Sequence, residues 1–355
     1  MKLFRFIIGT FFFVPLLQPV KIKAQSPQDF ASITILKEDL NILANGYFSP
    51  VLKSINIGMN TTWISSAKTH DIFGFDLRIG SSLVIIPGSE QSFTPIGLEY
   101  VKVPTAVLPT LSGFSSSTPL AISIPSTSGY NPISAELDFP GGLGSTLPIN
   151  AVPIPFGQIG IGLIPNTDIL FRGVPNSVSH DVDLGLIGFG VKHKLGQYVG
   201  IPQLSPYQFA IFGAYSVAYV SKKLADSEQM DTFTLFFGSV SEPSSLRLET
   251  ESKTIQFIGS IDLPLITAYA TIGYQNVSST LLARGDFGVL YQGKVNDQLV
   301  NYESVIKNPV TLLVNTKSNF VSLGAKLKVL FLHFNGDYTF SEYNTINVGV
   351  ALTFR

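Results

Sequence analysis

Ile346-Asn-Val-Gly-Val-Ala-Leu-Thr-Phe-Arg355, the last ten residues of the chain, decide the fold. Every second residue from Ile346 to Phe354 is apolar, and the residues between them are small or polar. Because side chains of a β-strand point alternately to its two faces, this pattern predicts a strand with one apolar and one polar face.

This terminal strand, with an aromatic residue next to its last position, resembles the closing strand of outer-membrane β-barrels. In such barrels the apolar face meets lipid and the polar face lines the lumen. The resemblance implies that Val350, Leu352 and Phe354 belong to a barrel-closing strand that contacts outer-membrane lipid. It also implies the barrel-assembly machinery as a partner during insertion.

The N-terminal residues predict export. Lys2 and Arg5 precede the apolar run 6–17, and Ala24 is a small residue suited to signal-peptidase cleavage. We therefore expect residues 1–24 to be a cleaved signal peptide and residues 25–355 to form a single domain. Beyond the signal, no run of about 18 apolar residues offers a transmembrane helix. The absence of cysteine excludes disulfides, thiolate metal sites and a lipid anchor on cysteine.

Charge and hydropathy favour the same class of protein. Of the 23 basic residues, four lie in residues 1–24, which leaves 19 basic against 24 acidic residues. Without a basic surplus, nucleic acid is not expected as a partner. Only 13% of the residues are charged, against about 25% in soluble proteins, and the mean hydropathy is +0.32. An exported chain of this composition favours strands that face lipid.

Residues 26–46 predict a short amphipathic helix. Ser26 can cap its beginning, Pro27 suits its first turn, and Gly46 suits the position after its end. We expect this helix to dock on the body of the fold. The alternative is a plug that enters the mouth of the barrel.

From Lys53 onward the apolar period becomes two, beginning with residues 55–63. Counting such segments, each of about 9–13 residues, predicts an all-β fold, a transmembrane antiparallel barrel of about 12–14 strands. Near Leu186 the alternation changes phase, which predicts a β-bulge or a barrel corner.

Proline is concentrated in one stretch. Residues 87–175 hold 13 of the 22 prolines, and no charged residue occurs from Val103 to Ala135. Since proline cannot donate to a sheet ladder, we expect 87–175 to be an irregular apolar insertion packed over or inside the barrel. The alternative is a long surface loop.

No motif for chemistry is present. The glycine pairs lack the spacing of a nucleotide-binding loop, no nucleophile elbow occurs, and the four histidines lack metal-site spacing. We expect no catalytic residue, no cofactor and no metal. Charged residues on predicted inner faces are candidates for tuning passage through a lumen. They are Asp76, Arg78, Lys326, Lys328, His333 and Asp337. The alternative is that they pair across a filled interior.

Four segments resemble an uncharacterised outer-membrane β-barrel family of Bacteroidota, over nearly the whole mature chain. They are Gly46–Pro50, Ser66–Arg78, Pro153–Gly162 and Gly188–Lys194. The order of parts resembles, more distantly, the outer-membrane long-chain fatty-acid transporters. These resemblances imply a location in the outer membrane and a barrel fold. They imply no ligand-binding residue.

Three functions follow from these observations. The first is an outer-membrane β-barrel that passes or binds a small apolar molecule. The second is a structural or accessory barrel with a filled lumen, in an envelope complex. The third is a secreted β-sandwich binding protein, in which the apolar strand faces turn inward. An enzyme is not expected.

Overall fold

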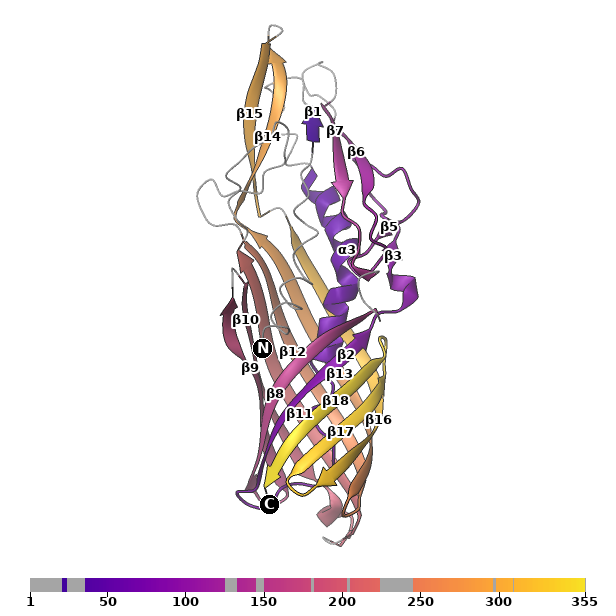
Figure 1. The fold of residues 1–355 in the computed structure, drawn as a ribbon, viewed down its shortest axis with the longest axis vertical. Helices are drawn as coiled ribbons and strands as arrows, with labels where there is room; N and C mark the ends of the chain where they lie inside the picture. Colours follow the sequence, from indigo (N-terminus) through magenta and orange to yellow (C-terminus); the bar gives the residue numbers. More distant parts are fainter. Residues whose placement is uncertain are drawn as a thin grey trace.

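The computed structural model describes residues 21–23, 36–124, 133–144, 150–179, 182–202, 205–223, 245–295, 298–308 and 310–354. Within these ranges ten strands form a closed barrel in which all neighbours are antiparallel, and a helix and a second sheet lie above it (Figure 1). The predicted all-β antiparallel barrel with an N-terminal helix is confirmed. In order around the wall, its strands are β10 (Val182–Lys194), β11 (Tyr207–Lys223), β12 (Ser245–Asp262), β13 (Ile266–Arg284), β16 (Thr311–Val329), β17 (Leu332–Phe340), β18 (Thr345–Phe354), β2 (Phe75–Ile85), β8 (Ala151–Ile164) and β9 (Thr167–Ser179).

The wall is apolar on its outer face. Its inner face carries polar side chains along much of its length and apolar ones, such as Leu248 and Leu312, where it packs on α3. Ile79 and Ile187 on the outer face are each 70% exposed, whereas the inward-facing Gln275 and Asn347 are fully buried. A soluble sheet buries its apolar face, but a membrane barrel turns that face to lipid. The β-sandwich alternative is therefore wrong, because the sheet closes on itself with its apolar face outward.

The C-terminal strand closes the barrel. β18 pairs with β17 on one side and with β2, the first strand of the wall, on the other. Val350, Leu352 and Phe354 lie in this strand, and the Phe354 ring stacks on that of Phe75 with 5.0 Å between centroids.

Ten wall strands are fewer than the 12–14 expected, because several strands pair outside the wall. β14 (Asp286–Val295) and β15 (Gln298–Lys307) form a hairpin that projects above the barrel (Figure 1). With β1 (Lys21–Lys23), β7 (Ile133–Phe139), β6 (Thr118–Ile124) and β4 (Val101–Lys102) it makes a six-stranded upper sheet. β3 (Ser92–Phe93) and β5 (Leu108–Pro109) form a separate pair, and η2 (Gly88–Glu90) and η4 (Gly196–Tyr198) are short 3-10 turns.

The described helix, α3, spans Leu36–Gly58. Most of the predicted helix start, up to residue 35, lies outside the described residues, and the predicted end at Gly46 is wrong. A Cβ atom on Gly46 would lie 2.1 Å from the Phe93 ring, so this glycine allows close packing inside the helix rather than ending it. No helix in the described ranges is long and apolar enough to cross a membrane.

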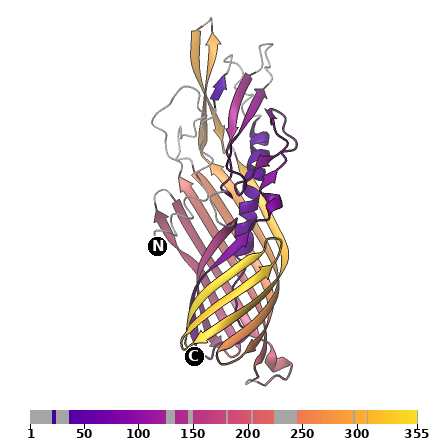
Figure 2. The same ribbon diagram turned by 45° about the vertical axis from the view of Figure 1, so that its right-hand side comes forward.

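α3 enters the upper opening of the barrel, and the chain then crosses the lumen (Figure 2). Near the end of α3, the Asn56 amide donates to Thr316 Oγ1 of β16 (3.0 Å). Residues 59–74, here called the lumen segment, continue to the lower end of the barrel, where β2 begins. The strand predicted over residues 55–63 is wrong: wall side chains enclose Asn56 as fully as Ile57, so the alternation does not mark two different faces.

The proline-rich stretch divides into two parts. Residues 86–124 and 133–144 pack over α3, where the Tyr47 hydroxyl donates to the Gly141 carbonyl (2.9 Å). β8 and β9, from residue 151 onward, belong to the wall, so the prediction of an insertion over the whole of 87–175 is wrong for its last part.

Prolines fit these two strands because each lies where the ladder to one neighbouring strand is missing or shifted. Pro153 and Pro155 lie where β8 pairs only with β2, since the ladder between β8 and β9 begins at Gly157 opposite Gly173. Pro175 lies at a register shift between β9 and β10, opposite residues 184–186. This shift confirms the irregularity predicted near Leu186.

Candidate functional site

The lumen segment is fixed to the wall by a buried arginine from β9. Arg172 Nη1 donates to the carbonyls of Met59 (3.2 Å) and Thr61 (3.1 Å). Its Nε and Nη2 donate to Gln158 Oε1 on β8, at 3.1 and 3.0 Å. The planar fork of the guanidinium suits this set of acceptors, which a lysine could not satisfy together.

Aromatic rings enclose the same guanidinium. Arg172 Cζ lies 4.0 Å from the centroid of Trp63 and 4.2 Å from that of Phe156. Trp63 is fully buried and packs on Phe212 of β11, with 5.5 Å between centroids. Trp63 thus anchors the lumen segment to the part of the wall formed by β9, β10 and β11.

Arg78 of β2 holds the next part of the lumen segment. Its Nη2 donates to Ser65 Oγ (3.0 Å), and its Nη1 lies 3.4 Å from the Thr62 carbonyl oxygen. Nη2 also pairs with Asp76 Oδ2 at 3.5 Å. Two arginines of the wall therefore bind backbone and side chains of residues 59–65.

The upper end of the lumen is covered by α3 and the residues that follow β2. The buried Asp39 carboxylate accepts hydrogen bonds from the backbone N–H groups of residues 99–101, at 2.8–3.2 Å. Lys53 pairs with Glu90 and Glu342, each at 3.2 Å. Burial opposes the charged form of Lys53, but the two carboxylates outweigh it and raise the pKa of this lysine. These contacts tie the helix to the insertion and to the turn after β17.

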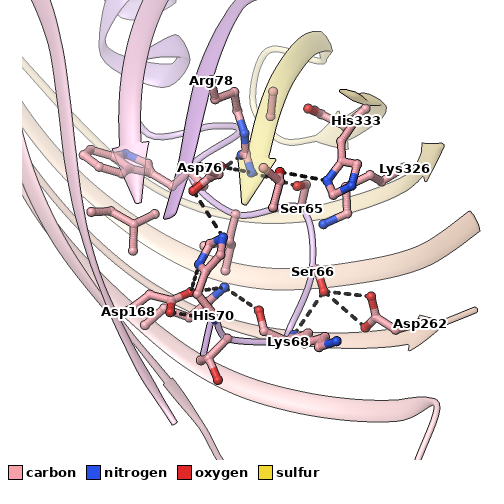
Figure 3. Close-up of a pocket in the computed structure, with 18 of the residues that line it drawn as sticks. Ser65, Ser66, Lys68, His70, Asp76, Arg78, Asp168, Asp262, Lys326 and His333 are labelled. Atoms are coloured by element: carbon pink, nitrogen blue, oxygen red, sulfur yellow. Dashed lines mark hydrogen bonds and ion pairs between the residues drawn. The ribbon is translucent and has the colours of Figure 1, made fainter. Parts of the chain in front are cut away.

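Below the two arginines lies a cavity of about 210 Å³, here called the lower-mouth pocket (Figure 3). The lumen segment forms one side of it and the wall forms the others. Its polar and charged lining residues are Ser65, Ser66, Lys68, Thr69, His70, Asp71, Asp76, Arg78, Asp168, Lys192, Asp262, Lys326, Lys328, His333, Asn335 and Thr353.

Two aspartates of the pocket bind the lumen segment. Asp168 of β9 accepts from the His70 backbone N–H (2.9 Å), lies 3.1 Å from His70 Nδ1 and pairs with Lys192 at 2.8 Å. Asp262, at the end of β12, accepts from the hydroxyl of Ser66 (3.0 Å). Figure 3 shows Asp168 beside His70 and Asp262 beside Ser66 in the lower part of the view, with Lys326 and His333 at the upper right.

The structure brings together five of the six charged residues singled out in the sequence. Asp76 and Arg78 from β2, Lys326 and Lys328 from β16, and His333 from β17 all line the pocket. Asp337 does not line it: its carboxylate accepts from the Tyr269 hydroxyl (2.9 Å) and the Asn347 amide (2.6 Å).

Sequence reasoning missed the residues of β9 and β10 and the lumen anchor. Asp168 and Arg172 lie four positions apart on β9, so the alternation of side chains along a strand places them on the same face. This alternation could have identified both as inward residues. Lys192 follows from the same pattern on β10. Nothing in the pattern indicates that Trp63 lies inside a barrel.

Among the residues that the structure describes, the pocket holds one contact between a histidine and a hydroxyl group: His333 Nδ1 lies 2.9 Å from Thr353 Oγ1. No serine or threonine hydroxyl of the described residues lies within hydrogen-bond distance of a His70 ring nitrogen, so no activated nucleophile is formed there. Within the described ranges, no group of three or more histidine, aspartate or glutamate side chains is placed to hold a metal ion.

A family model described as a family of unknown function, DUF6588, matches residues 1–354. The chain belongs to this family. No curated protein matches it. Among solved structures, the chain is similar to the translocator domain of the autotransporter NalP from Neisseria meningitidis, with 6% identity over 93% of this chain and 100% of that one and a TM-score of 0.29. It is also similar to a FadL homologue from Pseudomonas aeruginosa, with 9% identity over 95% and 98% and a TM-score of 0.20. The outer-membrane transporter YddB from Escherichia coli gives 6% identity over 79% and 41%, with a TM-score of 0.26.

Proposed function

We propose that this family member is an outer-membrane β-barrel whose lumen is filled by its own chain, a structural or accessory barrel of the envelope rather than an open pore. The single observation that carries this proposal is the fixation of residues 59–65 by Arg172 and Arg78. A plug that moves out of the lumen to open a pore would not need buried arginines of the wall to bind its backbone carbonyls. The apolar outer face would contact lipid, and the C-terminal strand would be read by the barrel-assembly machinery.

The lengths of the connections support an orientation. Three of the four lower connections between wall strands have two or three residues, and the fourth, residues 195–206, has twelve, whereas residues 86–150 connect β2 to β8 at the upper end. Outer-membrane barrels keep short turns on the periplasmic side and long loops outside. The lower mouth therefore faces the periplasm, and α3 and the upper sheet face the cell exterior, after cleavage of the signal peptide.

Conductance in planar lipid bilayers tests the filled lumen. The folded parent protein, identified by its different mobility before and after boiling in SDS, should give no steady current. The double variant Arg78→Ala/Arg172→Ala should open measurable channels, because it loses both wall anchors of the lumen segment. A steady ohmic current through the folded parent would contradict the proposal.

Binding or passage of a small apolar molecule is a second candidate, which one observation favours. An apolar groove of about 880 Å³ lies on the outer face beside the Gly157–Gly173 pair. Above this pair, residues 151–156 of β8 and 174–179 of β9 do not pair with each other. The apolar side chains that line the groove include Leu77, Ile79, Ile159, Phe171, Ile187 and Leu352.

Uptake of a fluorescent fatty acid tests this second candidate. Gly173→Leu would fill the groove from the outer face and should slow uptake several-fold. Gly213→Leu, an outward glycine of β11 away from the groove, is the matched control and should leave uptake unchanged. Equal uptake by cells with and without the protein would contradict this candidate and leave the filled barrel in place.

A further inference from the structure

One wall of the lower-mouth pocket consists of hydrogen-bond donors, and we call it the donor wall. It is built from two cross-strand pairs at consecutive inward positions of β16 and β17. On β18, the positions that pair with this part of β17 hold Gly349 and Ala351, so no large side chain of that strand fills the space beside it. The donor-wall pairs are Lys326 opposite Asn335 and Lys328 opposite His333.

The carboxylates of the pocket pair with only one of the two lysines of this wall. Asp168 binds Lys192 and His70 on the other side of the pocket. Asp262 accepts from hydroxyl groups and lies 3.5 Å from Lys328. The Lys326 ammonium, in contrast, has no carboxylate oxygen within 4.0 Å and makes no hydrogen bond among the described residues.

The partner of Lys326 across the strands is also unsatisfied. Asn335 is only 6% exposed, and neither atom of its amide makes a hydrogen bond of ordinary length and angle within the described part of the chain. The neighbouring Tyr269 hydroxyl donates to Asp337 instead. Leaving a buried amide and a half-buried ammonium without partners is costly, and a ligand that accepts from both offsets this cost.

We propose that the donor wall binds a small oxyanion, phosphate or a short carboxylate. The Lys326 ammonium and the Asn335 amide nitrogen would donate to its oxygens, and Lys328 and His333 would border it. The cavity of about 210 Å³ holds such an ion with several waters, since a water takes about 30 Å³. The proposal rests on the lumen segment being in place, because Ser65 and Ser66 form part of the pocket.

Isothermal titration calorimetry on the folded protein in nonionic detergent tests this site, with inorganic phosphate and acetate as separate probes at pH 7. The parent should bind at least one of them saturably at millimolar concentrations. Binding of phosphate alone assigns a tetrahedral oxyanion, and binding of acetate alone assigns a carboxylate. Lys326→Met should weaken binding about 10- to 100-fold, the loss of a charged hydrogen bond.

Two further variants separate the site from general effects. Asn335→Asp keeps the side-chain shape but places a carboxylate beside Lys326, so it should abolish binding. Lys317→Met removes an exposed cation from the outer face of the same strand, β16, and should bind like the parent. The proposal is overturned if the parent binds neither probe, or if Lys326→Met and Lys317→Met bind equally. Conductance tests the filled lumen independently of anion binding. A parent protein that gives no steady current and binds neither probe would contradict the anion site and leave the proposed filled lumen standing.

Discussion

Replacing Arg172 by alanine should release the lumen segment without breaking the wall. Toward the lumen segment, the variant loses two hydrogen bonds to carbonyls of residues 59–61 and one cation–π contact with Trp63. A hydrogen bond from a charged donor contributes about 1.5–3 kcal/mol, and a desolvated cation–π contact about 2 kcal/mol. The gross loss is therefore about 5 kcal/mol at the low end of these ranges.

Part of this loss is returned, because the guanidinium no longer has to be buried. Arg172 has no carboxylate within 4.0 Å among the described residues, so its desolvation is compensated only by neutral acceptors and rings. We take the net loss as about 3 kcal/mol, which raises the population of the displaced segment about 100-fold.

The labelling rate of a single cysteine measures this population. The chain has no cysteine of its own, and Ala67 in the lumen segment is fully buried. Ala67→Cys should react with a maleimide about 100-fold faster when combined with Arg172→Ala, since labelling follows the open population. Arg172→Lys keeps the charge but not the fork and should fall between the two. Lys253→Ala, an exposed cation of the outer face, is the control and should not change the rate. A rate within threefold of the parent, in a barrel that still shifts on boiling, would refute this reasoning.

Three further predictions test other contacts of the fold. Gly188→Ala should lower the free energy of unfolding, measured by urea titration, by about 1–3 kcal/mol, because the new Cβ would lie 2.8 Å from the Trp63 ring. Gly213→Ala is the control and should leave the free energy of unfolding unchanged, because its Cβ would meet nothing closer than 3.9 Å. Asp39→Ala removes the acceptor for the backbone N–H groups of residues 99–101 and should make this stretch sensitive to protease, with fragments cut there on gels. Single cysteines should report the orientation: an impermeant maleimide should label Ala106→Cys on intact cells, but label Leu330→Cys, in a lower turn, only after permeabilisation.

The strands of the wall could be predicted because their two faces meet different surroundings. Leu323 and Leu327 face outward on β16 and Lys326 faces inward, as the alternation indicates. The same logic fails for residues 55–63. This stretch is enclosed on every side, so the alternation of apolar and polar residues does not distinguish an inner from an outer face. It fails for Gly46 as well, because only the approach of Phe93 explains a glycine there.

The pocket could be predicted only in part. Period two identifies Asp76, Arg78 and Lys326 as inward residues, but it cannot tell at which height each one lies in the lumen. Asp337 shares a face with Asn335 yet binds Tyr269 outside the pocket. Asp168 reaches the site only because closure of the sheet brings β9 around to the lumen segment.

A disulfide cross-link tests most directly whether the lumen segment fills the barrel. The Ala67 backbone N–H donates to Ser260 Oγ, an inward residue of β12, at 3.0 Å. Ala67→Cys/Ser260→Cys should therefore cross-link in isolated outer membranes under mild oxidation, giving a faster band on boiled, non-reducing gels that reductant reverses. Ala67→Cys/Ile261→Cys, whose second cysteine faces outward, should not cross-link. Absence of the first cross-link, or equal cross-linking of both pairs, would contradict the filled barrel.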